Sequence, residues 1–368
     1  MKLSISESRF LREYWQQKPL LLPQALPGFR SPLSAEELAG IAMESFIESR
    51  LVAKSQGVWT QQVGPFNAED FDRDDEWTLL VQGLDQWHAG VAALRTHIDF
   101  LPRWRFDDIM VSYAVDGAGV GPHFDRYDVF LLQGDGSREW RIGGHCDDDT
   151  PQLQANGLTL ISEFEPIDTY LLAPGDILYI PPGVAHWGIA RGESLTFSLG
   201  FRAPSIADLL AHRADNLLEL LAPTSLLEDM PDLPPGRPGE ITLEHIRNAK
   251  DALANASDAL DNHRWFGETV TRERASEEDD FFDPQPSLMG PCVRLSGRAR
   301  VAWAEREQHV DVFINGETFE VPSSAIHNLT ALCRQEPLVL AHLAEADETL
   351  LNALVAAGAI EDCDSDGR

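Results

Sequence analysis

The chain has 368 residues, and its 60 Asp and Glu outnumber its 29 Lys and Arg, which gives a formal net charge of −31. This charge disfavours general affinity for nucleic acid or anionic membranes, because the surface repels phosphate, but it is compatible with a basic protein partner. No apolar run approaches the ~18 residues of a membrane span. The first residues, MKLSISESRF, lack the apolar stretch of a secretory signal.

Four cysteines are spread along the chain without a CxxC pair: Cys146, Cys292, Cys333 and Cys363. This spacing argues against a disulfide framework and against a zinc site built from thiolates. It indicates the reducing cytoplasm as the compartment of the protein.

The first 204 residues form a β-rich segment. Short runs of alternating apolar and polar residues, rich in β-branched and aromatic side chains, are separated by Gly and Pro turns. These runs are Ile109–Val115, Val129–Gln133, Thr169–Leu172, Ile177–Ile180 and Leu195–Phe201. Because no regular helices separate them, the pattern favours a sandwich or barrel.

The pattern becomes helical in residues 205–285. Ser205–Leu221 carries Leu and Ile at helical spacing, and its first residue is a suitable N-cap. A Pro- and Gly-rich connector, Pro231–Gly239, precedes a second helical stretch, Thr242–Trp265. The acidic run Glu273–Asp283 then predicts a solvated linker.

Residues 286–368 mix strands and helices in the manner of a winged-helix domain. The predicted elements are the strands Val293–Trp303 and Val310–Val321 and the helices Ser323–Cys333 and Asp347–Ala357. The dipeptide Asn315-Gly316 predicts a hairpin turn within the second strand region. Because this segment holds 13 acidic residues against 6 basic ones, a structural or protein-contact role is expected here rather than DNA binding.

The segment VGPHFDRYDVF contains the residues that indicate most clearly what chemistry the protein performs. His123 and Asp125 stand two residues apart at the start of a predicted strand, so both side chains point to one face. A later segment, LAPGDILYIPPGVAHWG, makes two tight turns and delivers His186 to the start of another strand. Two His and one Asp leave half of a metal's coordination sphere open, as in the facial triad of non-haem Fe(II) oxygenases. A closed zinc site would need a fourth ligand, for which the sequence offers no candidate at suitable spacing.

A chelating co-substrate would also need a cation. Arg138 follows on the next strand, and its planar guanidinium suits a carboxylate. By spacing alone it could equally be a surface arginine beside Glu139. Ser112, on the preceding strand, is a candidate second donor, although an isolated strand serine often has no special role.

With these motifs the chain resembles the JmjC-type cupin oxygenases that hydroxylate ribosomal proteins. It is most similar to the bacterial arginine hydroxylases that act on large-subunit protein sixteen. The resemblance covers nearly the whole chain and is carried by Phe10–Leu22, Glu36–Val52, Trp77–Gln82, Gly119–Gly134, Pro174–His186 and Ser198–Pro204.

The resemblance implies a mainly β fold with α elements. It divides the chain into a double-stranded β-helix (cupin) domain over residues 1–204, a helical dimerisation domain over 205–285 and a winged-helix-like domain over 286–368. It places Fe(II) on His123, Asp125 and His186, and the carboxylate of 2-oxoglutarate on Arg138 and Ser112, with O2 as the other co-substrate. The implied enzyme is a cytoplasmic homodimer that hydroxylates an arginine β-carbon in a basic ribosomal protein, without a membrane or nucleic-acid partner.

Other interpretations of the residues stay open. The same chemistry could act on a protein His or Lys, or on a small molecule. The chain could also be a non-redox cupin that serves as a binding module, although such cupins often show H-x-H…E…H instead of H-x-D…H. Asp116 and Asp128, which flank the predicted metal strand, are candidates for a substrate guanidinium or are solvated turn residues.

Overall fold

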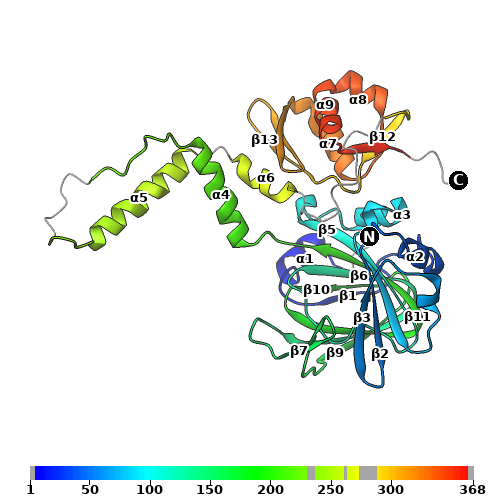
Figure 1. Ribbon diagram of the computed structural model, residues 1–368. Coiled ribbons are helices and arrows are strands. Elements are labelled where there is room, and N and C mark those ends of the chain that lie inside the picture. The colour runs from blue at the N-terminus through cyan, green and yellow to red at the C-terminus, as the bar shows by residue number, and fades with distance from the viewer. Residues whose placement is uncertain (1–4, 230–236, 261–262, 273–287, 364–368) are drawn as a thin grey trace.

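The computed structural model describes residues 5–229, 237–260, 263–272 and 288–363 (Figure 1). Most of the predicted connector Pro231–Gly239 lies outside the described residues, and so do the acidic run Glu273–Asp283 and the predicted boundary at residues 285 and 286. No helix in the described ranges is long and apolar enough to cross a membrane.

The N-terminal domain is a double-stranded β-helix, as predicted. Its strands are β1 (Leu20–Leu22), β2 (Ser49–Ser55), β3 (Val58–Val63), β4 (Glu76–Val81), β5 (Phe106–Ala114), β6 (Asp128–His145), β9 (Asp168–Leu172), β10 (Ile177–Ile180) and β11 (Val184–Phe201). They form one antiparallel sheet in the order β1-β10-β6-β11-β5-β4-β2-β3, with β9 also paired to β6. A small hairpin joins β7 (Gln152–Ala155) to β8 (Leu158–Ile161).

Two strands are much longer than the sequence pattern predicted. β6 and β11 each run for 18 residues and pair along nearly their whole length, and this pairing has register shifts near Arg191 and Leu195. Bulges of this kind bend a strand and increase its twist. Each of the two strands can therefore contribute to both sides of the barrel.

Alternation along the strands separates an inner face from an outer one. On β10, Ile177 and Tyr179 belong to the main core, whereas Leu178 and Ile180 belong to a second cluster inside the barrel. The short helices cover the outer face and its rim: α1 (Glu7–Glu13), α2 (Ala35–Ile41), α3 (Ala89–Ala92) and the 3-10 turns η1 (Ala68–Phe71), η2 (Leu84–Gln86), η3 (Ala93–Ile98) and η4 (Arg103–Arg105). The helices therefore lie outside the barrel, and the metal-site candidates share its interior with the second cluster.

Aromatic rings hold the N-terminal helix on the barrel. Phe10 of α1 lies 5.0 Å from the ring of Tyr179 and 5.8 Å from that of Phe130, and all three are fully buried. Tyr179 donates a hydrogen bond of 2.6 Å to Asp128, which also pairs with Arg105 at 3.1 Å. Asp128 is buried inside this network, so the interpretation of Asp128 as a contact for a substrate guanidinium is wrong.

The helical region extends away from the barrel (Figure 1). The predicted helix Ser205–Leu221 is confirmed as α4 (Ile206–Leu220), with the side chain of Ser205 accepting a hydrogen bond from Asp208 N–H. The sequence predicted one helical stretch over Thr242–Trp265. The structure has two helices instead, α5 (Leu243–Ala259) and α6 (Arg264–Thr271). His263, which has a φ of +59°, precedes α6, and this left-handed conformation cannot continue a helix.

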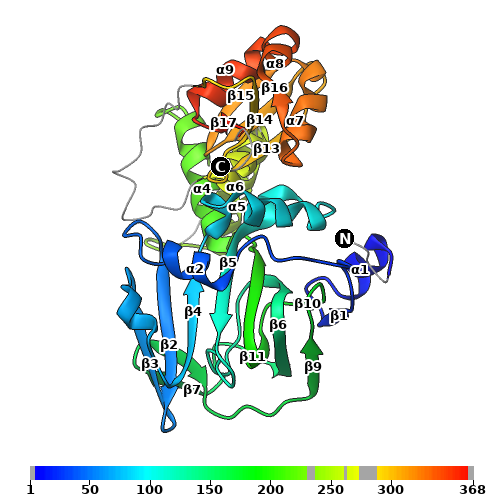
Figure 2. The same cartoon turned by 90° about the vertical axis from the view of Figure 1, so that its right-hand side faces the viewer.

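The C-terminal domain stacks on one end of the barrel, beside α3 and the start of β5 (Figures 1 and 2). Its elements are β12 (Cys292–Leu295), β13 (Val301–Glu305), β14 (Val310–Ile314), β15 (Glu317–Val321), η6 (Ser323–Ala325), α7 (Ile326–Cys333), β16 (Leu338–Val339), α8 (Leu340–Ala346), α9 (Glu348–Ala356) and β17 (Ile360–Asp362). The hairpin turn at Asn315-Gly316 is confirmed, since both residues have positive φ, +51° and +89°.

The structure corrects two expectations for this domain and adds one helix. Val293–Trp303 is not a single strand, because the chain turns between β12 and β13, which belong to different sheets. Helix α8 was not predicted from the sequence. Cys292 and Cys363 form a disulfide, contrary to the expectation of unpaired cysteines, because β12 and the residue after β17 lie side by side.

Helix α6 packs against the C-terminal sheet. A Cβ on Gly267 would lie 2.3 Å from the ring of Phe313, so this close approach requires glycine. Arg264 pairs with the buried Asp311 of β14 at 3.1 Å. We propose that α6 belongs structurally with the C-terminal domain.

Candidate metal centre

The three predicted metal ligands meet at one end of the barrel interior. His186 lies on β11, opposite Ile142 of β6. His123, in the loop before β6, exchanges two backbone hydrogen bonds with His186, at 3.0 and 2.8 Å. The backbone carbonyl of Asp125 accepts a hydrogen bond of 2.7 Å from Gly183 N–H in the Pro-Pro-Gly turn. These backbone contacts hold both motifs against each other.

The ligand atoms are close enough to share one ion. One donor atom from each of His123, Asp125 and His186 lies within 4.8 Å of the others, and His186 Nε2 is 3.5 Å from Asp125 Oδ2. Within the described ranges the group contains no fourth His, Cys, Asp or Glu donor. The donor set thus matches a facial triad with open positions and not a closed zinc site.

Both imidazoles have the tautomer that metal binding needs. Nδ1 of His123 lies 2.9 Å from the carbonyl of Gly121, and Nδ1 of His186 lies 2.9 Å from that of Val184. Each Nδ1 therefore carries the proton and donates it, which leaves the Nε2 lone pair for a metal. Burial, with repulsion from His123 as the second cause, lowers the pKa of His186 to about 4, so this ring is neutral at pH 7 and can bind a cation.

Arg138 is buried in the same barrel. Its side chain donates to the hydroxyl of Ser112 at 2.9 Å and to that of Ser194 at 3.0 and 3.2 Å. No carboxylate among the described residues forms an ion pair with Arg138, and burial lowers the pKa of its guanidinium to about 10. A desolvated guanidinium held only by neutral groups is a site for an anion. The surface interpretation of Arg138 is therefore wrong.

Two buried donors near these residues have no partner in the described part of the chain. They are Nε1 of Trp140 and Oγ1 of Thr78. The ring of Trp140 lies 6.0 Å from that of His186, and Thr78 pairs with Ala114 of β5, two residues from Ser112. Buried polar groups without partners are rare in proteins, so these two mark places where a polar ligand fits.

Sequence reasoning missed three of these residues: Thr78, Trp140 and Ser194. The register of the sheet is what places these three residues in the site. One local sequence feature, a glycine, accompanies Trp140. Gly188 stands opposite Trp140 on β11, and a Cβ there would lie 2.8 Å from the indole. The other predicted candidate, Asp116, accepts a hydrogen bond of 2.7 Å from Gly192 N–H at an exposed turn.

A second His-Asp-Glu group lies in the C-terminal domain: His309, Asp311 and Glu320. Asp311 already pairs with Arg306 at 2.7 Å and with Arg264, and Arg264 also binds Glu320. The guanidinium groups of Arg264 and Arg306 therefore already bind the carboxylates that a metal ion would need as ligands. We interpret this group as an ion-pair network that fastens α6 to the sheet.

Comparisons with known proteins agree with this geometry. The JmjC domain family matches residues 93–209, and the ROXA-like winged helix family matches residues 255–361. The Ribosomal protein uL16 3-hydroxylase of Escherichia coli K12 is 36% identical over 340 residues, which cover 87% of each chain. The chain belongs to the JmjC ribosomal oxygenase family.

Further ribosomal oxygenases are similar in sequence or structure. A probable ribosomal oxygenase of Haemophilus influenzae is 38% identical over 209 residues, which cover 56% of this chain and 52% of its own. A crystal structure of E. coli YcfD matches with a TM-score of 0.82 at 33% identity, covering 98% of this chain and 99% of that one. Another YcfD structure, with a TM-score of 0.78 at 34% identity, 98% and 99% covered, is a complex with cobalt and 2-oxoglutarate.

The triad geometry predicts a metal affinity that depends on each of its imidazoles. Replacing His123→Ala or His186→Ala should weaken Co²⁺ binding in calorimetry by well over tenfold, because a direct ligand is lost and even outer partners of metal ligands are worth ~10–100-fold. His145→Ala is the matched control, since His145 is exposed just beyond the site. Equal Co²⁺ affinity in all four proteins would contradict the assignment.

Proposed function

We propose that this ribosomal oxygenase uses Fe(II), O2 and 2-oxoglutarate to hydroxylate the β-carbon of an arginine in ribosomal protein uL16. The observation that carries the proposal is the pairing of an open His-Asp-His triad with a buried arginine, Arg138, that has no carboxylate partner among the described residues. The similarity to a uL16 3-hydroxylase over most of both chains supports the choice of substrate.

The triad side chains would hold the metal on one side only. His123, Asp125 and His186 supply three ligands from the barrel wall, and their hydrogen bonds to backbone carbonyls keep the imidazoles oriented. Bound Fe(II) would supply the activation of O2 that is coupled to the oxidative decarboxylation of 2-oxoglutarate. The protein contributes a buried, preorganised set of donors around that ion.

Arg138 would bind the distal carboxylate of 2-oxoglutarate. Its planar guanidinium can donate two parallel hydrogen bonds, and Ser112 and Ser194 fix its orientation from either side. Burial has removed most water from this charge, so the carboxylate would serve as its counterion. Trp140 Nε1 and Thr78 Oγ1 are further donors inside the barrel that a polar co-substrate can satisfy.

The acidic surface suits a basic substrate. A net charge of −31 attracts a cationic ribosomal protein over a range of about a Debye length and raises the rate of encounter. This steering is independent of the chemistry at the metal. Because its ribosomal substrate is made there, we place the enzyme in the cytoplasm.

Intact-mass analysis of uL16 tests the proposal directly. Incubation with the enzyme, Fe(II) and 2-oxoglutarate should add one oxygen atom to uL16, and fragmentation should locate it on an arginine. A His186→Ala enzyme is the control and should leave the mass unchanged. Turnover of 2-oxoglutarate without any change in uL16 would reject the substrate but keep the oxygenase chemistry.

Arg138 should act on the co-substrate and not on the metal. In Arg138→Ala we expect the KM for 2-oxoglutarate to rise by about tenfold or more, because charge-assisted hydrogen bonds to a buried anion are lost. Co²⁺ affinity should stay as in the wild type. Arg191→Ala is the matched control, since Arg191 is exposed and pairs with Glu139. An unchanged KM in Arg138→Ala would refute the role.

We also propose that the helical arm of α4 and α5 forms a homodimer. On α4, Ile206, Leu210 and Leu218 lie on one face at multiples of four residues and are 72, 66 and 69% exposed. On α5, Leu243 and Leu253 are 74 and 72% exposed. An apolar face of this extent on an arm that extends from the body fits a second copy of the same arm.

The dimer proposal predicts a change of molar mass. Leu210→Glu combined with Leu218→Glu should convert the dimer to a monomer in light scattering coupled to gel filtration, because two charges would have to be buried in the interface. Leu153→Glu serves as the control, because Leu153 is 54% exposed on β7, away from the arm. A wild-type protein that is monomeric at micromolar concentration would overturn the proposal.

A further inference from the structure

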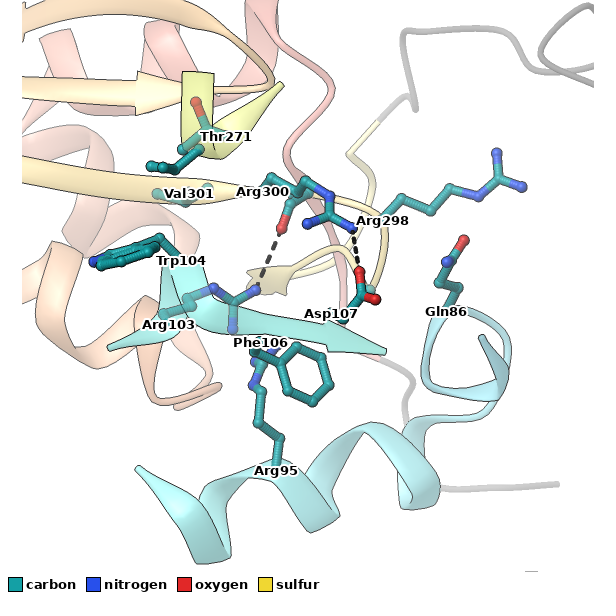
Figure 3. A pocket seen from close by; sticks show the side chains of 13 residues that line it. Gln86, Arg95, Arg103, Trp104, Phe106, Asp107, Thr271, Arg298, Arg300 and Val301 are labelled. Carbon is teal, nitrogen blue, oxygen red and sulfur yellow. Dashed lines mark hydrogen bonds and ion pairs between the residues drawn. The ribbon is translucent and has the colours of Figure 1, made fainter. Parts of the chain in front are cut away.

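A small cavity lies where the C-terminal domain meets the barrel domain (Figure 3). Its volume is about 50 Å³, and it is lined by Arg95 of η3, Arg103 and Trp104 of η4, Asp107 of β5 and Arg300 next to β13. It therefore draws residues from both domains and contains several guanidinium groups. The metal centre contributes none of its lining residues.

The walls of the cavity are rigidly joined. Arg103 donates to the carbonyl oxygens of Ala299 and Cys333, at 3.3 and 3.5 Å, and so ties η4 to the C-terminal domain. Gly297 approaches η2 so closely that a Cβ there would lie 2.6 Å from the carbonyl of Asp85. These contacts hold the lining residues in place, so the cavity is a fixed feature of the junction.

Arg95 is the unusual residue of the cavity. Its guanidinium stacks on the ring of Phe106 at 5.0 Å, and Nη2 is buried without a hydrogen-bond partner in the described parts of the chain. Figure 3 shows Arg95 rising from η3 under Phe106 toward Arg103. Two guanidinium groups thus share one buried space, and burial lowers the pKa of both, that of Arg95 to about 9.

The nearby carboxylates do not neutralise this charge. Asp107 binds Arg300 at 3.4 Å and Arg202 at 3.0 Å, so its single charge is already shared with arginines outside the pair Arg95 and Arg103. Asp85 interacts with Arg95 only at a distance, and burial raises the pKa of Asp85 to about 7. At neutral pH the pair Arg95 and Arg103 therefore retains excess positive charge.

We propose that this cavity binds a small tetrahedral oxyanion of the phosphate class, held by Arg95 and Arg103. Water could satisfy the free N–H of Arg95, but only an anion also offsets two desolvated positive charges. The small volume excludes a nucleotide or a peptide side chain with its backbone. Arg103 is bonded to the C-terminal domain, whereas Arg95 has no hydrogen bond to the described residues of that domain, so the anion would join the two domains through these residues.

Calorimetric titration with inorganic phosphate at constant ionic strength, with chloride as the reference anion, tests the proposal. The wild type should bind phosphate saturably, and Arg95→Gln should weaken the affinity by about tenfold or more, as expected for the loss of a charge-assisted contact. Arg50→Gln, which removes an exposed arginine on β2, is the matched control and should bind as the wild type does.

Two further measurements locate the bound anion. Arg138→Gln should leave intact the phosphate binding that depends on Arg95, because Arg138 lies in the barrel and not at the junction. In the wild type, phosphate should slow hydrogen exchange over residues 297–301, a readout that does not require Arg95→Gln to fold. No saturable binding by the wild type, loss of binding in Arg138→Gln, or unchanged exchange at 297–301 would overturn the proposal.

Discussion

The antiparallel pairing of β6 with β11 is the interaction on which the rest of the active-site region depends. Its register sets Ile142 opposite His186, Trp140 opposite Gly188 and Arg138 opposite Ala190. Residues that stand opposite each other point to the same face, so this one register turns the imidazole, the indole and the guanidinium into the barrel together. A slip of β6 by one residue would turn Trp140 and Arg138 outward while His186 on β11 still faced the barrel interior.

The charges of the protein act over two different distances. The surface carries a large negative charge, whereas two buried positions hold guanidinium groups that lack carboxylate hydrogen bonds among the described residues, Arg138 in the barrel and Arg95 at the domain junction. The electric field of the negative surface acts on macromolecules, because it extends over about a Debye length in water. Buried cations act on small anions, because little solvent screens them there. One chain can therefore attract a basic protein and still bind anionic small molecules.

Local sequence signals predicted the parts of the fold that local physics controls. Asn315-Gly316 predicted a hairpin because both positions require positive φ, and Ser205 predicted the start of α4 because its hydroxyl caps the helix. The predictions were wrong where distant segments decide the outcome. The pairing of Cys292 with Cys363 and the burial of Asp128 beside Tyr179 both join residues that are far apart in sequence.

The sequence by itself predicted His123, Asp125 and His186 as the candidate metal ligands, because the spacing of His123 and Asp125 on a strand and the turns before His186 are local properties of the chain. Only the tertiary structure decided the rest of the site. Ser194, Trp140 and Thr78 have no distinctive spacing, and they join Arg138 and the triad only through the register of neighbouring strands. The sequence also does not predict that Arg95 and Arg103 line one cavity, because that cavity forms only where a separate domain packs against the barrel.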